Sequence, residues 1–117
     1  MIATPEYNHS ISGVLKNAID WASRPPKNTP LNVKPLAIMG ASGGTAGTIR
    51  VQMHLRQICV FTNMLPLNKP EIYVMRAVEK FNAEGKLIDE PTRQRVRELL
   101  MTLQDWTHRL HGETKIN

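Results

Sequence analysis

Two segments of this chain carry residue types that could bind a flat, partly polar ligand. The first, Thr4-Pro5-Glu6-Tyr7-Asn8, offers an aromatic ring for stacking at Tyr7 and an amide for hydrogen bonding at Asn8. The second, Gly40-Ala-Ser-Gly-Gly-Thr-Ala-Gly47, is so rich in small residues that its backbone can lie close to a ligand. Each segment directly follows a short apolar run, so each is expected at the end of a strand.

The glycine-rich segment matches neither of the common phosphate-binding fingerprints. No Gly-Lys-Ser/Thr follows it, the spacing is not Gly-x-Gly-x-x-Gly, and no acidic residue lies about 20 residues further on to hold a ribose. Two interpretations of this segment therefore stay open on its own residues, a tight turn without a ligand and a ligand-binding loop. The neighbouring segment 4–8 favours the second, because ligands bind outside the carboxyl ends of parallel strands.

Other pairs of polar side chains have less chemical meaning. His108 and His111 can share one helix face, but no cysteine or carboxylate partner lies nearby in sequence, so we expect no metal site. Cys59 does not form a known nucleophile–base signature with His54, and we expect it to pack as a small apolar side chain. Arg50 could form an ion pair with Glu71 if the expected helix and strand meet.

The elements that must position the two segments follow from the spacing of apolar residues and from turn and cap signals. Residues 64–67 form either a linker or a short extended piece. We expect the end of a strand at 1–4, a helix from Ser10 or Ser12 to about 22, a buried strand at 36–39, a helix from 45 or 48 to about 62, a strand at 71–75, a helical turn at 78–81, a helix from 89 or 90 to 111, and a polar tail at 113–117. Strands alternating with helices indicate an α/β fold with a parallel sheet.

Composition narrows the class of protein. The chain has 117 residues, 41% hydrophobic and 21% charged, which suits one domain with a packed core. Its net charge of +5 would attract anions, but the basic residues are scattered and predict a solvated surface, with no nucleic-acid partner. One cysteine excludes an internal disulfide, and no apolar run is long enough to span a bilayer. We therefore expect a cytoplasmic protein without a membrane partner.

The order and content of several motifs resemble the NADPH-dependent FMN reductase family, which includes flavodoxin-like quinone, azo-dye and chromate reductases. The most specific blocks are Thr4-Pro5-Glu6-Tyr7-Asn8 and Ser12-Gly-Val-Leu-Lys-Asn-Ala-Ile-Asp-Trp21. The same order continues with Lys34-Pro35, the turn Ala41-Ser-Gly-Gly44, the block Arg50-x-Gln52-x-His54-Leu-Arg-Gln57 and the block Asn68-Lys-Pro-Glu71. The resemblance covers nearly the whole chain.

The resemblance implies a flavodoxin-like three-layer α/β fold with FMN at the strand ends. NADPH or NADH would reduce the flavin, and a quinone-like, azo or metal-oxyanion acceptor would take the electrons. Because the hydride passes through the flavin, no side chain is expected to be a catalytic acid or base. Family members usually form dimers or tetramers, so a homo-oligomer is expected. The residues implied at the isoalloxazine ring are Pro5, Glu6, Tyr7 and Asn8 on one loop and Ser42, Gly43 and Gly44 on the facing loop.

Set against the family pattern, residues 1–117 correspond to a partial domain. We expect only its carboxyl-terminal part, with the family's strands 4 and 5, its helices 3 to 5 and a remnant of strand 3. The Ser/Arg-rich loop that holds the FMN phosphate in the family precedes the matched region. The alternative expectation is therefore a non-catalytic, truncated remnant that self-associates and binds FMN weakly or not at all.

Overall fold

The predicted alternation of strands and helices in an α/β fold is confirmed. The computed structural model describes residues 1–112, and the polar tail predicted at 113–117 lies outside the described residues. The elements are β1 (Ile2–Ala3), α1 (Gly13–Ala22), the 3-10 helix η1 (Pro26–Asn28), β2 (Pro35–Leu36), β3 (Ile38–Ala41), α2 (Ile49–Thr62), β4 (Leu65–Pro66), β5 (Ile72–Val74), the 3-10 helix η2 (Ala77–Glu79) and α3 (Glu90–His111).

The strands pair in parallel around a central extended segment at residues 35–41. β3 lies between β1 and β5, with Met39 opposite both Ala3 and Ile72. β2 pairs with β4 in the same direction, with Pro35 opposite Leu65. Residues 64–67, left open as a linker or an extended piece, are therefore partly a paired strand. Sequence patterns missed this pairing because two-residue strands carry no periodicity.

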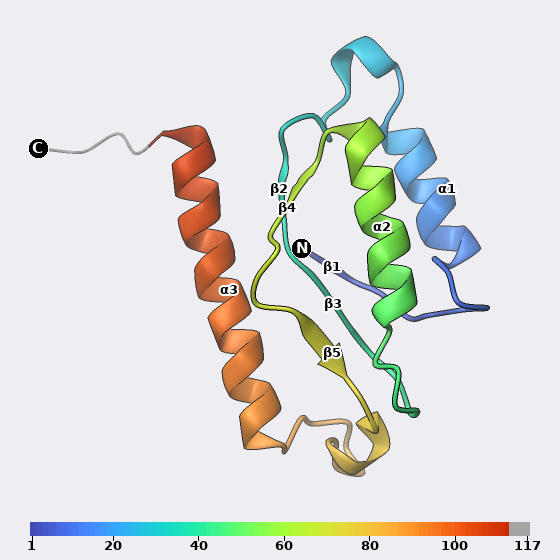
Figure 1. Ribbon diagram of the computed structural model, residues 1–117, viewed down its shortest axis with the longest axis vertical. Helices are drawn as coiled ribbons and strands as arrows, with labels where there is room; N and C mark the ends of the chain where they lie inside the picture. Colours follow the sequence, from blue (N-terminus) through green and yellow to red (C-terminus); the bar gives the residue numbers. More distant parts are fainter. Residues whose placement is uncertain (113–117) are drawn as a thin grey trace, which may run out of the picture.

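The sheet is the middle of three layers, with α1 and α2 on one face and α3 on the other (Figure 1). Side chains of successive strand residues point to opposite faces. Leu36 and Ile38 accordingly pack with Leu55 of α2 in one core. The intervening Ala37 packs on the other face, against Leu99 of α3. A buried parallel sheet therefore needs apolar residues at consecutive positions, which explains the continuous run at 36–39.

The buried face of α2 includes Cys59, as predicted for an apolar packing role. Its side chain is buried, and desolvation raises the pKa of the thiol. The opposite side of α2 exposes Val60 and Phe61, which are 83% and 80% accessible to solvent. Trp21, near the end of α1, is likewise 75% exposed. Apolar side chains thus remain on the outer surface of α1 and α2.

The helix ends are set by local hydrogen bonds. Ser12 caps α1 by accepting from the N–H of Leu15, and Asp89 caps α3 by accepting from the N–H of Thr92. Asn63 ends α2 in the left-handed conformation, as expected for a residue that tolerates positive φ. Within residues 1–112, no helix has the length and apolarity needed to cross a membrane.

Gly40 allows β1 and the start of α2 to approach the central strand. A Cβ atom on Gly40 would lie 2.3 Å from Thr48 Oγ1 and 2.6 Å from the carbonyl oxygen of Thr4. Both contacts are shorter than real Cβ atoms make, and one of them is to backbone. The absence of a side chain at residue 40 is therefore what lets the ends of β1 and β3 lie close together.

We predict that Gly40→Ala lowers the free energy of unfolding by about 1–3 kcal/mol, the usual range for overpacking. Gly43→Ala is the matched control, because a Cβ atom on Gly43 meets no atom within 4 Å. Its effect should stay within about 0.5 kcal/mol. Urea denaturation of the two variants and the wild type checks both values, and equal stabilities of the two variants would contradict the close-approach argument.

Candidate functional site

Two loops meet at the carboxyl ends of the parallel strands. Residues 4–12 follow β1, and residues 42–48 follow β3, the strand beside it. The segment after β5 lies against the second loop at the same end of the sheet (Figure 1). This is the edge where ligands bind in open parallel sheets, so the topology brings together the two segments that the sequence singled out.

The loop after β1 forms a tight hairpin that presents aromatic and amide side chains. Tyr7 and Ser10 exchange two backbone hydrogen bonds, of 3.0 and 2.9 Å between nitrogen and oxygen. Asn8 and His9 lie between them with φ of 50° and 65°, as a type I′ turn requires. The Tyr7 side chain is 59% exposed, and Asn8 is exposed beside it. The turn therefore holds both side chains on a defined backbone.

The glycine-rich loop is fixed by the segment that follows β5. The N–H of Ser42 donates to the carbonyl of Val74 at 2.9 Å, and the N–H of Ala77 donates to the carbonyl of Ser42 at 2.9 Å. The hydroxyl oxygen of Ser42 accepts from the N–H of Gly47 at 3.1 Å, which closes the loop on itself. The exposed Gly43 and its neighbour have open space where a Cβ atom would stand. A flat group can therefore approach this backbone closely.

Glu6 links the first loop to the start of α2, and through it to the second loop, which α2 follows without a break. Its Oε2 accepts from the backbone N–H groups of Arg50 and Val51, at 3.0 and 3.2 Å, and its Oε1 pairs with Arg50 Nη1 at 3.1 Å. Arg50 and Val51 lie in the first turn of α2, which follows the glycine-rich loop. The suggested Arg50–Glu71 ion pair is therefore wrong, and Glu71 Oε1 pairs instead with Lys69 Nζ at 3.1 Å.

The Glu6 carboxylate stays ionised in this position. Desolvation raises its pKa, but the hydrogen bonds from Val51 and Arg50 and the Arg50 charge together lower the pKa below its ordinary value of 4.5. A carboxylate with a lowered folded-state pKa stabilises the fold above its unfolded-state pKa and loses that contribution as the pH falls through the folded value. The link between the loops therefore persists at neutral pH and weakens only in acid.

A second contact joins the hairpin to α2. Ser10 Oγ lies 2.8 Å from His54 Nδ1, and His54 follows Arg50 by one helical turn. Asn8, His9 and Met53 border a shallow, open hollow of about 450 Å³ next to these contacts. One signal for the Glu6 contact was overlooked in the sequence. The first turn of α2 has no acidic residue of its own, so a carboxylate from elsewhere in the chain is favoured there.

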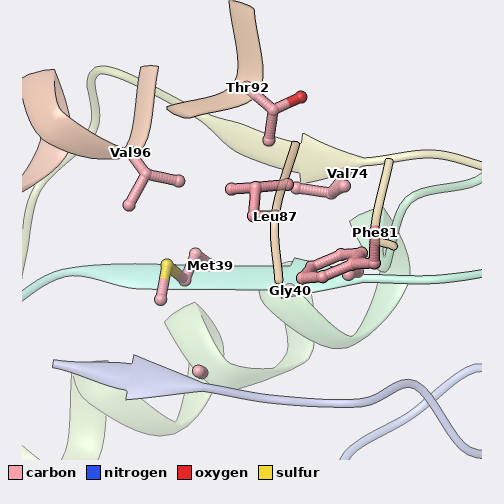
Figure 2. A pocket seen from close by; sticks show the side chains of 9 residues that line it. Met39, Gly40, Val74, Phe81, Leu87, Thr92 and Val96 are labelled. Atoms are coloured by element: carbon pink, nitrogen blue, oxygen red, sulfur yellow. The ribbon is translucent and has the colours of Figure 1, made fainter. Parts of the chain in front are cut away.

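An apolar cavity of about 280 Å³ lies elsewhere, on the face of the sheet that α3 covers. Figure 2 shows Val96, Leu87 and Phe81 arranged over Met39 and Gly40 of β3. None of the seven predicted site residues lines this cavity. The cavity nevertheless borders the two loops, because Ala3 and Ala41, which directly precede them, are among its lining residues.

The structure brings the seven predicted site residues to one end of the sheet, in two loops that Glu6 joins. Their contact with a ligand stays a prediction. Among residues 1–112, no three His, Cys, Asp or Glu side chains gather closely enough to hold a metal ion. The chemistry available here is therefore the binding and orientation of a planar molecule by an exposed tyrosine, an amide and open backbone.

Comparison with known proteins gives the family. Residues 1–79 match the family model described as NADPH-dependent FMN reductase. The chain is 54% identical over 112 residues to an NAD(P)H-dependent FMN reductase of Pseudomonas aeruginosa, covering 96% of this chain and 60% of that protein. It is 48% identical over 118 residues to an NADPH:quinone oxidoreductase of Arabidopsis thaliana, covering 97% of this chain and 57% of that protein.

A solved structure supports the same relationship. The flavoenzyme NAD(P)H:(acceptor) oxidoreductase FerB of Paracoccus denitrificans superposes with a TM-score of 0.81 at 34% identity, covering 92% of this chain and 59% of FerB. The chain thus spans about 60% of the length of these relatives. The family match takes in β1, both loops and β5, and on that ground the chain belongs to the NADPH-dependent FMN reductase family.

Proposed function

We propose that this chain belongs to an NAD(P)H-dependent oxidoreductase that carries FMN and passes electrons to a small acceptor. The observation that carries the proposal is the pair of loops that Glu6 holds together at the carboxyl ends of β1 and β3. Quinone-like acceptors have the strongest support, since one relative is named as a quinone oxidoreductase. Azo and metal-oxyanion acceptors rest on the family resemblance alone.

The residues of the two loops suit a flavin ring. Tyr7 offers an exposed aromatic face, and Asn8 offers an amide that can donate to or accept from the polar edge of the ring. Gly43 and Gly44 leave room for the ring to lie against their backbone. Pro5, Glu6 and Ser42 complete the two loops on either side. When bound, FMN would supply the hydride and electron transfer.

The protein's part in this chemistry is binding and orientation. The loops would hold the ring at a fixed angle, limit water around it and leave one face open for the nicotinamide and then for the acceptor. We assign no side chain as a catalytic acid or base. The cytoplasmic location and the carboxyl-terminal placement within the family domain stay predictions.

We also propose that the chain self-associates through the outer surface of α1 and α2. Val14 and Trp21 of α1 and Val60 and Phe61 of α2 are all strongly exposed apolar side chains. Val14 and Trp21 are seven residues apart and so lie on one side of α1, and exposed apolar side chains are often buried in protein–protein contacts. A second copy of this chain is the partner we propose, in line with the expected homo-oligomer.

Titration of FMN with the purified chain tests the proposed cofactor. We expect flavin fluorescence to change with micromolar or tighter affinity, and the loaded protein to oxidise NADPH in the presence of a quinone. Gly43→Val should weaken this affinity by about tenfold or more, because the new side chain would fill the space left for the ring.

Gly13→Val is the matched control for this titration, since residue 13 also has open space but lies at the start of α1. Its affinity for FMN should equal that of the wild type. If the wild-type chain shows no FMN binding, the alternative of a non-catalytic remnant is correct for residues 1–117. If both substitutions weakened the affinity for FMN equally, the glycine-rich loop would not be part of the flavin site.

Sedimentation velocity tests the proposed self-association. We expect the wild type to sediment as a dimer or larger species, and the double substitution Val60→Ser, Phe61→Ser to shift it toward the monomer. The control is Leu100→Ser, Met101→Ser, which removes two exposed apolar side chains from α3 instead. A wild type that stays monomeric at every concentration, or an equal effect of the two double substitutions, would contradict this surface.

A further inference from the structure

The side chain of Glu6 has an unusual place for a residue of an exposed loop. Its side chain is only 11% accessible, whereas Tyr7 next to it is largely exposed. Both of its oxygens are engaged, and all of their partners belong to residues 50 and 51 of α2. The side chain is thus turned onto the helix, while the next two residues of the loop face outward.

The first turn of α2 needs this carboxylate. N–H groups at a helix start have no partner within the helix, and a negative charge there is stabilised by the helix dipole. Thr48, at the N-cap position, has φ of 71° and makes no side-chain cap bond. Glu6 therefore supplies, from 44 and 45 residues away in the chain, the acceptor that a local cap residue normally provides.

The same contact sets the geometry of the two loops. Glu6 lies one residue before Tyr7 and two before Asn8. The residues that it binds, 50 and 51, come just after the glycine-rich loop in the chain. Ser10 and His54 add a second contact on the other side of the Tyr7–Ser10 hairpin. The hairpin is therefore attached to α2 at both ends, and it cannot turn away from the glycine-rich loop without breaking a charge-assisted hydrogen bond.

We propose that Glu6 is a positioning residue that fixes the hairpin of Tyr7 and Asn8 against the glycine-rich loop, and that its side chain is not a ligand of the flavin. The expected effect of Glu6 on the affinity for FMN rests on the proposed function. The attachment of the hairpin itself can be measured without any flavin. The substitution Glu6→Gln keeps the size of the side chain and removes its charge.

The control is Asp89→Asn, which also removes a carboxylate from a helix start. Asp89 caps α3 by accepting from Thr92, far from the two loops in the chain. If Glu6 acted only as a helix cap, the two substitutions would have the same kind of effect. If Glu6 positions the hairpin, only Glu6→Gln should loosen the loops.

Amide hydrogen exchange on the full chain without flavin decides between these cases. We expect Glu6→Gln to speed exchange at the N–H groups of Tyr7 and Ser10 by about tenfold or more, through local opening and with the core amides unchanged. Asp89→Asn should leave both rates at the wild-type value. Unchanged exchange at Tyr7 and Ser10 in Glu6→Gln, or a uniform rise over the whole chain, would overturn the proposal.

FMN titration of the same proteins supplies the second readout. Glu6→Gln should bind FMN about tenfold more weakly than the wild type, and Asp89→Asn should bind it equally well. Equal affinity of Glu6→Gln and the wild type would overturn the proposal. If the wild type binds no FMN, the proposed function fails, and the exchange rates still decide whether Glu6 holds the hairpin.

Arg50→Met, which leaves the two backbone N–H groups in place, serves as a milder variant of the same contact if Glu6→Gln does not fold.

Discussion

The carboxylate of Glu6 at the start of α2 is the interaction on which the arrangement of the two loops depends. It meets a requirement of the helix, because Thr48 makes no side-chain cap bond and the N–H groups of Arg50 and Val51 donate to Glu6 instead. It also answers a requirement of the site, because the acceptor comes from the loop that presents Tyr7 and Asn8. The ionised Glu6 side chain thus stabilises the start of α2 and also holds the loop of Tyr7 and Asn8 in place at the edge of the sheet.

The parallel sheet makes this contact possible. β3 lies between β1 and β5, so the loops after neighbouring strands emerge at the same edge. Gly40 then brings Thr48 and the end of β1 to within van der Waals distance of the central strand, which no larger residue would allow. Three features contribute to this arrangement: the short apolar run at 36–39, the absence of a side chain at Gly40, and the carboxylate of Glu6. They place the hairpin, the glycine-rich loop and the start of α2 together.

Much of this could be predicted from the sequence, because local signals were strong. Periodic apolar residues identified α1 and α3, and Ser12 and Asp89 were recognised as possible caps. Contacts between distant residues could not be predicted in the same way. An ion pair between Arg50 and Glu71 was expected only if the helix and the strand met, whereas the fold brings Glu6 to Arg50. Pairing between β2 and β4 was missed because so short a strand has no pattern of its own.

We propose that the Tyr7–Asn8 hairpin and the glycine-rich loop form one site for a flavin ring. Residue-resolved NMR of the labelled chain, recorded while FMN is added, tests it most directly. We expect the amide signals of Tyr7, Asn8, Gly43 and Gly44 to shift together and to saturate with one affinity. Shifts confined to the residues around the apolar cavity under α3, or movement of one loop without the other, would contradict it.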